Sequence, residues 1–257
     1  MSLNTKVRFL QLVNYILAFV AIWYVLLTSD YSLLIYSMVS WFIIGHVSTI
    51  ITLHRLLTHR SFSTYKWLEN ALSLISVIST VGPTISWVAL HRMHHQHSDT
   101  NSDPHTQYRE GKHSIIDSIK VFIGYDWIIS NIPVKYVKDL MREPIHKFIF
   151  NHYFKIIFTF IAILIMIDPI LVLFVYSLPA TLTVITIGIV NTLGHGHGYR
   201  NHETKDKSTN SWIANVISLG EGMHNNHHAK PNKWYVGEKW YELDVMGCII
   251  MLIKKYK

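Results

Sequence analysis

Four long runs of apolar residues interrupt the chain, and each is long enough to form a membrane-spanning helix. The hydrocarbon core of a bilayer requires about 20 apolar residues in a helix. A single aspartate, Asp30, lies in the short break between the first two runs, and Asp168-Pro169 separates the last two. These breaks are so short that we expect two tight helical hairpins. The four runs are Phe9–Thr28, Leu33–Leu53, Phe148–Ile167 and Ile170–Leu193.

A fifth apolar stretch, Trp67–Val81, has a different pattern. Its apolar residues share one helical face, and asparagine, serine and threonine residues occupy the other. It covers 15 residues before Gly82-Pro83. This pattern is typical of a helix that lies on the membrane surface. A fifth span is the alternative.

The positions of lysine and arginine predict the orientation. The chain carries 23 of them against 16 acidic residues, a net charge of +7. Two precede the first run, eleven lie between Arg55 and Lys147, and nine lie from Arg200 to the end; one, Lys155, is inside the third run. By the positive-inside rule, both termini and the central loop are cytoplasmic. The charge also favours attraction to anionic lipid headgroups or acyl-carrier phosphates. We find no basic block or aromatic motif that would indicate a nucleic-acid partner.

Together these features predict an all-α integral membrane protein with four transmembrane helices and a cytoplasmic helical cap. We expect one domain, residues 1–257, with spans near 9–28, 33–53, 148–167 and 170–193 and a cap of residues 54–147 and 194–257. The single cysteine, Cys248, excludes an internal disulfide and a cysteine-based zinc motif. The first run is too long for a cleavable signal peptide and has no small-residue cleavage site.

Among the 17 histidines are three groups whose spacing predicts which imidazole rings lie close together. On a helix, positions i, i+3 and i+4 share a face, so an H-x-x-H-H motif presents its imidazoles together. Asn191 and His195, at the end of the fourth run, have the spacing i, i+4. Imidazole is a ligand for iron, zinc, copper or nickel. The groups are His54-Arg-Leu-Leu-Thr-His59, His91-Arg-Met-His94-His95 and His224-Asn-Asn-His227-His228.

The pair His54 and His59 does not fit one helical face, because its spacing is i, i+5. It requires a helix end or a bend between its members, or ligation of different metals. If Trp67–Val81 stays on the surface, all the histidine groups lie on the cytoplasmic side. A shared metal site therefore argues for four spans independently of hydropathy.

Nine imidazoles exceed what one metal accepts, which predicts two metals with four or five ligands each. A zinc hydrolase normally uses three protein ligands, often with a carboxylate. An all-nitrogen pair of metals beside a membrane favours redox chemistry. A metal transporter or sensor is a competing hypothesis, but it requires polar ligands within the spans. Those hold only His46 and a few serines and threonines.

At these motifs the sequence resembles the membrane fatty-acid desaturases of the acyl-CoA (stearoyl-CoA) desaturase type. The resemblance covers about residues 40–235 in the family's order and spacing. It includes Asn191-Thr-Leu-Gly-His195, which is similar to the family's N-x-x-x-H on the last membrane helix. The other matching stretches are His54 to Phe62, Trp87 to His95 with Ser98-Asp99 and Asp103-Pro104-His105, and Gly220 to His228.

The resemblance implies an oxygen-dependent desaturase that introduces a cis double bond into a saturated fatty-acyl chain. Asn191 would hold a water on one of two iron ions, and Asp99 and Asp103 would orient ligand rings. Trp87 would line the acyl tunnel, or else pack in the core. A membrane hydroxylase or ketolase on the same iron scaffold is the alternative. The implied iron ligands are His54, His59, His91, His94, His95, His195, His224, His227 and His228.

The partners implied are an acyl substrate, membrane lipids and an external electron donor such as ferredoxin or cytochrome b5. The chain lacks the haem-binding His-Pro-Gly-Gly of a fused cytochrome b5. Vertebrate enzymes carry charged residues for CoA just before the second motif, where this chain has Ala89-Leu90. The carrier is therefore CoA, acyl-carrier protein or an intact lipid. Bond position, chain length and oligomeric state are not predicted.

The remaining histidines receive simpler interpretations. For His46, a hydrogen bond between helices is favoured over a functional role. His97 and His197 are alternative metal ligands, each beside a better-placed histidine. We expect the others to face water or headgroups: His105, His113, His146, His152 and His202.

Overall fold

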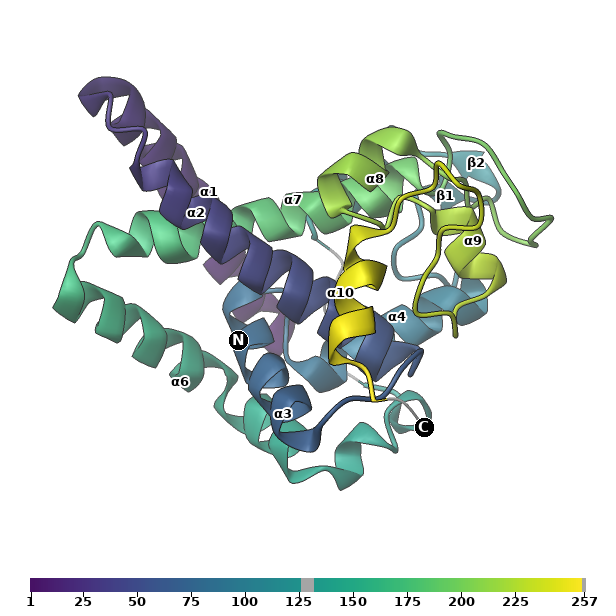
Figure 1. The fold of residues 1–257 in the computed structure, drawn as a ribbon, viewed down its shortest axis with the longest axis horizontal. Coiled ribbons are helices and arrows are strands. Elements are labelled where there is room, and N and C mark those ends of the chain that lie inside the picture. The colour runs from purple at the N-terminus through teal and green to yellow at the C-terminus, as the bar shows by residue number, and fades with distance from the viewer. Residues whose placement is uncertain (126–131, 256–257) are drawn as a thin grey trace.

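The structure is a computed structural model that describes residues 1–125 and 132–255. The predicted cap therefore includes two segments, 126–131 and 256–257, that lie outside the described residues. The part described is mainly helical, with one antiparallel hairpin of two short strands (Figure 1). Its elements are α1 (Leu3–Thr28), α2 (Leu33–Trp41), η1 (Phe42–Thr58), α3 (Lys66–Ile75), η2 (Ser76–Ser79), α4 (Thr84–His97), β1 (Tyr108–Arg109), β2 (Lys112–His113), α5 (Ile115–Phe122), η3 (Val134–Tyr136), η4 (Leu140–Arg142), α6 (Pro144–Ile167), η5 (Val172–Ser177), α7 (Leu178–Leu193), α8 (Trp212–Ser218), α9 (His224–Ala229) and α10 (Val245–Ile253).

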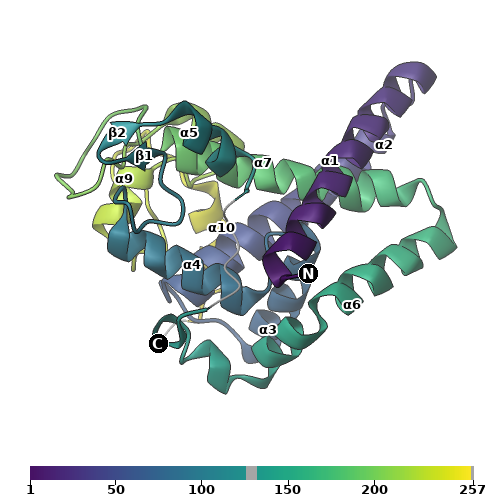
Figure 2. The ribbon, with the colours of Figure 1, turned by 180° about the vertical axis from the view of Figure 1, so that it is seen from behind.

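The four predicted apolar runs all form helices that can cross a membrane. Within residues 1–125 and 132–255, four helices have the required length and hydropathy: Leu3–Thr28, Leu33–Thr58, Pro144–Ile167 and Val172–Leu193. They form two hairpins that project to one side of the molecule, while α8, α9 and the strands gather at the other (Figures 1 and 2). The prediction of four apolar helices in two hairpins is therefore confirmed.

Aspartates shape both hairpin tips. Asp30 accepts a hydrogen bond from the backbone N–H of Ser32 at 3.2 Å, and Asp168 accepts one from Ile170 at 2.9 Å. In each case the side chain bonds the backbone two residues later, which is the geometry of an Asx turn. These residues therefore end one apolar helix and start the next within a few residues.

The fifth apolar stretch ends in a sharp bend. It forms α3 and η2, and the chain then turns by 84° into α4. Thr80 and Gly82 take positive φ angles of 59° and 107° at this turn, and Pro83 precedes the first residue of α4. The count of candidate spans is four, or five if this bent pair in the described part of the chain is taken as one span. A helix on the membrane surface and a fifth span are therefore both consistent with the structure.

The segment η1, which carries the first histidine pair, is a π-helix. The hydroxyls of Ser48, Thr49, Thr52 and Thr58 each donate to the carbonyl five residues earlier, at 2.8–3.1 Å. The N–H of the next residue, His59, donates to the carbonyl of His54 at 3.2 Å. π-Helices are rare and often lie at functional sites. Because residues five apart are aligned in this helix, the i, i+5 pair shares one face.

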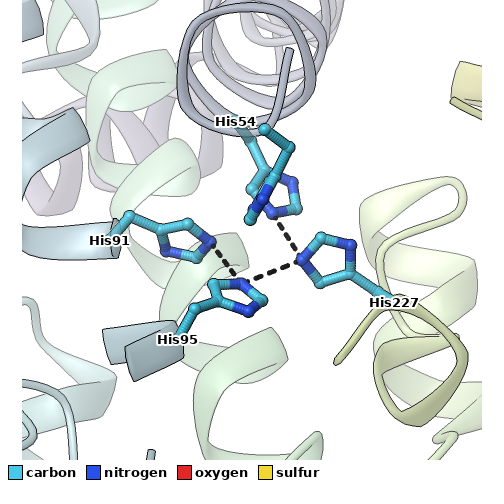
Figure 3. A group of neighbouring side chains, drawn as sticks. His54, His91, His95 and His227 are labelled. Carbon is cyan, nitrogen blue, oxygen red and sulfur yellow. Dashed lines mark hydrogen bonds between the residues drawn. The ribbon is translucent and has the colours of Figure 1, made fainter. Parts of the chain in front are cut away.

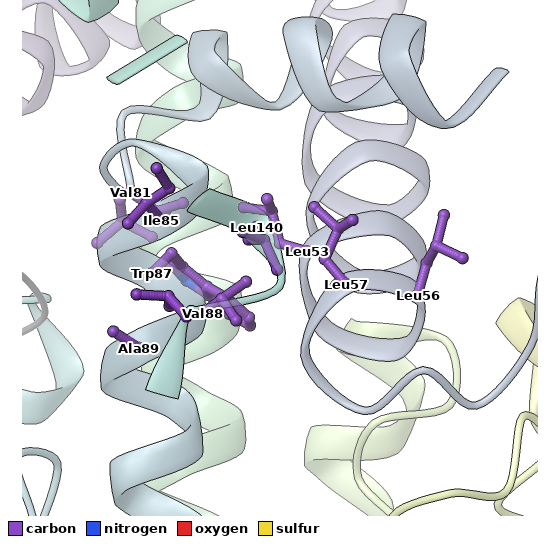
Figure 4. Close-up of a cluster of buried hydrophobic side chains, with 11 residues drawn as sticks. Leu53, Leu56, Leu57, Val81, Ile85, Trp87, Val88, Ala89 and Leu140 are labelled. Carbon is purple, nitrogen blue, oxygen red and sulfur yellow. The ribbon is translucent and has the colours of Figure 1, made fainter. Parts of the chain in front are cut away.

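An apolar cluster fixes η1 against α4, the helix with the second histidine motif (Figure 4). Leu53 and Leu57 of η1 pack with Ile85 and Val88 of α4, and all four side chains are buried. Such packing excludes water and sets the separation of the two helices. The first two histidine motifs are therefore held at a fixed distance from one another.

A buried arginine ties the C-terminal segment to the second span. Arg55 of η1 is only 1% exposed, and its guanidinium donates to Glu221 and Asp244, both at 2.7 Å. It also donates to the carbonyl of Trp234 at 2.8 Å. Asp244 in turn caps α10 by accepting the N–H of Gly247 at 2.8 Å. Arg55 therefore links two segments: the chain just before α9, through Glu221, and the start of α10, through Asp244.

Asp244→Asn should destabilise the protein strongly, because it leaves a buried guanidinium with one carboxylate fewer. Breaking a buried pair from one side costs about 3–5 kcal/mol. Thermal unfolding in detergent, followed by circular dichroism, measures the effect. The matched control is Glu238→Gln, at a partly exposed carboxylate that pairs with the exposed Lys230, and it should cost less than about 1 kcal/mol. Equal melting temperatures for the two variants would contradict the role given to Arg55.

Candidate metal centre

The nine histidines of the three motifs and the end of α7 come together as two neighbouring groups. Within each group the ring nitrogens lie within 4.8 Å of one another. The first, called here the five-histidine group, is His54, His59, His91, His95 and His227. The second, called the four-histidine group, is His94, His195, His224 and His228. The other histidines of the described residues belong to neither group.

Each H-x-x-H-H motif contributes to both groups. From α4, His91 and His95 enter the five-histidine group, while His94 enters the other. From α9 the division is reversed, with His227 in the five-histidine group and the remaining two in the other. In each motif the first and third histidines, at positions i and i+4, enter the same group, and the middle one, at i+3, enters the other. The reason is that adjacent positions of a helix, such as i+3 and i+4, point in directions about 100° apart. The expectation that all three rings point one way is corrected: each motif straddles two positions.

The spacing of the ring nitrogens suits a metal. In the five-histidine group, Nε2 of His227 lies 3.0 Å from Nε2 of both His54 and His95, and Nε2 of His91 lies 3.2 Å from that of His95 (Figure 3). In the four-histidine group, His224 Nε2 lies 3.0 Å from His195 Nε2. Two ligands at right angles on a metal, with bonds of about 2.1 Å, are separated by about 3.0 Å.

Carboxylates determine which ring nitrogens face inward. Four rings have Nδ1 within hydrogen-bond distance of an acidic side chain, and a carboxylate can only accept. Nδ1 must therefore carry the proton, which leaves a lone pair on Nε2. The pairs are His54 with Glu221 at 2.7 Å, His94 with Asp103 at 3.0 Å, His195 with Asp99 at 2.9 Å and His228 with Asp206 at 2.8 Å.

These tautomers make the centre a fit for cations. Where a carboxylate fixes the tautomer, the Nε2 lone pair points at a neighbouring ring, as from His54 toward His227 and from His195 toward His224, both at 3.0 Å, and a positive ion between such rings could bind both nitrogens. Nε2 of His59 and Nε2 of His94 are buried with no hydrogen-bond partner. Buried polar atoms normally have one. A metal in each group would satisfy both.

Burial also keeps most rings neutral. It lowers the pKa well below the usual histidine value for His59, His91, His95, His224, His227 and His228. For His94, burial acts in the same direction, but Asp103 and its neighbours raise the pKa. Burial alone would raise the pKa of Asp103, and His94 instead holds it below its usual range. Neutral rings can bind metal at pH 7, while a proton competes for His94.

A narrow cavity opens beside both groups. Trp87 stacks on His91, with ring centroids 5.0 Å apart, and forms one wall. Asn191, buried one turn before His195, lines the same cavity. Apolar or weakly polar side chains complete the lining, including Thr49, Ile50, Thr186, Ile187 and Val190. Trp87 also packs in the apolar cluster, which confirms the expected core packing, while its role in an acyl tunnel stays a prediction.

The structure corrects two expectations about the remaining histidines. His105 and His146 were expected to face water or headgroups, but both are buried. His105 packs against His94, and His146 hydrogen-bonds Thr84 at 3.1 Å. His46 donates to the carbonyl of Ile217 at 3.2 Å, which joins η1 to α8 as predicted.

The other expectations have mixed outcomes. His113 is exposed, as expected, while His152 and His202 are half-buried. His97 and His197, the alternative ligands, lie in neither histidine group of the described residues.

Sequence reasoning missed the supports around α9. Asn210 accepts the N–H groups of Asn225 and Asn226 at 3.0 and 3.2 Å, and so caps α9 from outside the helix. The Asn226 amide donates to Glu242 at 2.8 Å. Glu221, three residues before His224, was visible within its motif. Asp206 lies in a loop and has no periodic relation to any histidine, so no sequence signal marked it.

Comparison with known proteins agrees with this geometry. The family model described as fatty acid desaturase matches residues 32–244. An sn-1 stearoyl-lipid 9-desaturase of Anabaena variabilis is 34% identical over 225 residues, covering 83% of this chain and 78% of that protein.

Two further relatives carry similar names. A Synechocystis sn-1 stearoyl-lipid 9-desaturase is 32% identical over 232 residues, covering 82% of this chain and 65% of its own length. A Nostoc sn-2 palmitoyl-lipid 9-desaturase is 32% identical over 217 residues, which cover 82% of this chain and 74% of that protein. The region that the family model matches, residues 32–244, contains every histidine of both groups. Because this match covers most of the chain, the chain belongs to the fatty acid desaturase family.

Proposed function

We propose that the chain is an acyl-lipid desaturase that holds two irons with its nine clustered histidines and forms a cis double bond in a saturated acyl chain. Membership of the family makes it an oxidoreductase that desaturates fatty-acyl chains. The observation that carries the proposal is the pair of inward-facing histidine groups beside an apolar cavity.

The nine histidines would ligate the metals, and the donor set favours iron. All the donors are neutral nitrogens, which suit iron as well as zinc or copper. The family resemblance and the redox reaction select iron among these. When bound, the two irons would supply the oxygen-dependent chemistry that removes hydrogen from an unactivated methylene. Asn191 would hold a water beside the four-histidine group.

The protein's own side chains position and shield the substrate. The acyl chain would enter the cavity lined by Trp87, Ile50, Thr186, Ile187 and Val190, whose buried surface excludes water. The carboxylates, including Asp99 and Asp103, would keep each ligand ring in the tautomer that binds metal. The reacting carbons would then be fixed by how far the chain can enter.

An intact lipid is the favoured acyl carrier. The relatives above are named as desaturases of stearoyl-lipid and palmitoyl-lipid, and each name gives position 9. In this chain Ala89 and Leu90 are buried, at 0% and 1% exposure. No charged side chain stands at these positions to bind the phosphates of CoA. We therefore place the new double bond at carbon 9 of a lipid-bound chain.

The reaction needs an external reductant. Taking two hydrogens from the acyl chain supplies only half of the electrons that convert oxygen to two water molecules, so a donor must supply the rest with two protons. A ferredoxin or a cytochrome b5 has the required chemistry. We place the histidine groups and both termini on the cytoplasmic side, where the positive-inside rule puts them, within a single membrane domain of residues 1–257.

Expression in a host with a simple fatty-acid profile tests the proposal. Gas chromatography–mass spectrometry should show a new acid with its double bond at carbon 9. His94→Ala should abolish the product and lower bound iron, while His113→Ala, an exposed histidine outside both groups, should change neither. A hydroxylated product would favour the hydroxylase or ketolase alternative. A purified protein without bound iron and without product would contradict the proposal.

The cavity gives a second prediction. Thr186 is 3% exposed and lines the cavity, so Thr186→Phe should obstruct the acyl chain. We expect the product to fall by about tenfold or more, or to shift to shorter chains. Iron content should stay unchanged. Ile185→Phe, at a neighbouring position of α7 that does not line this cavity, is the control. Equal product from both variants would place the acyl chain elsewhere.

A further inference from the structure

The carboxylates behind the histidine rings are distributed unevenly. Three of the four rings in the four-histidine group bond an aspartate through Nδ1, namely His94, His195 and His228. In the five-histidine group, only His54 has such a partner among the described residues, and it is Glu221. The same ring type therefore has different surroundings in the two groups.

The three aspartates are held as anions by other donors. Asp103 accepts the backbone N–H groups of Asp99 and His105, both at 2.8 Å. Asp99 accepts that of Lys207 at 2.7 Å. Hydrogen bonds of this kind stabilise the ionised carboxylate.

The third aspartate, Asp206, is held in the same way. Its Oδ1 accepts the N–H of Ser208 at 3.0 Å and the hydroxyls of Ser208 and Thr204, both at 2.6 Å. Its other oxygen is left for His228. In the part of the chain that the structure describes, none of the three aspartates forms an ion pair with a lysine or arginine.

The glutamate behind the five-histidine group is compensated instead. Arg55 donates to Glu221 at 2.7 Å and to Asp244 at 2.7 Å, so one guanidinium lies between two carboxylates and offsets one of their charges. All three groups are buried, and interactions between buried charges are strong. Three carboxylates without a lysine or arginine ion pair in the described residues therefore stand behind the four-histidine group, whereas the single carboxylate behind the five-histidine group shares Arg55 with Asp244.

We infer that the two positions bind a divalent cation with unequal affinity, and that the four-histidine position is the stronger. The inference rests on the proposed metal centre. A carboxylate bonded to a ligand ring raises the basicity of that ring, and its loss typically lowers metal affinity about 10–100-fold. Three such partners outweigh the one extra neutral imidazole of the other group. The centre should therefore fill in order.

Cobalt(II) titration of the purified, chelator-treated full chain in detergent tests this order. Cobalt binds imidazole sites, and its visible bands report each binding step. The tighter step should belong to the four-histidine position, and the variants make that assignment. Asp206→Asn should weaken this step about tenfold or more and leave the second unchanged. Asp99→Asn should do the same, which guards against a folding defect peculiar to one loop; circular dichroism checks both.

Two matched variants complete the test. Glu221→Gln should weaken the second step more than the first; circular dichroism checks its fold, because Arg55 loses one of its two carboxylates. Glu238→Gln, at a partly exposed carboxylate that touches none of the nine rings, should alter neither step. Equal steps, or the same step weakened most by both Asp206→Asn and Glu221→Gln, would overturn the inference. Ordered binding in a protein that makes no double bond would support it and count against the proposed function alone. A wild-type chain that binds no cobalt would overturn both.

Discussion

The structure depends on holding neutral imidazole nitrogens close together in a buried site. Rings whose Nδ1 is fixed by a carboxylate turn their Nε2 lone pairs into the two histidine groups, as His195 does toward His224 at 3.0 Å, an arrangement that suits cations. Because free rings would rotate away from this arrangement, the fold must supply the restraint. Most of the elements described above, from the π-helix to the C-terminal segment, contribute to it.

The restraints differ in kind from one helix to the next. In η1, hydroxyls bonded to carbonyls five residues earlier accompany the wide turn that aligns His54 with His59. In α4, packing against η1 fixes the helix. The helix α9 has only six residues, and it is held in place by hydrogen bonds of buried asparagines and by the contact of Arg55 with Glu221, just before the helix. A short helix has little stability of its own, so its position comes from these polar contacts.

The sequence predicts the four apolar helices and the histidine motifs, because hydropathy and helical spacing are local properties. It does not predict the π-helix, since no propensity distinguishes η1 from an ordinary apolar span, and the i, i+5 pair looked anomalous for that reason. The division of each H-x-x-H-H motif between two positions depends on how α4 and α9 face each other. Asp206, and the buried state of His105 and His146, depend likewise on contacts between distant segments.

The division of the motifs also bears on how such a centre can evolve. Because α4 and α9 each supply ligands to both positions, no single helix can be lost, lengthened or rotated without disturbing both. A change that moves either helix therefore alters both positions at once. The two positions therefore constrain the sequence as one unit, and the constraint is weakest on the exposed apolar surfaces of the four long helices and in the loops that carry no ligand.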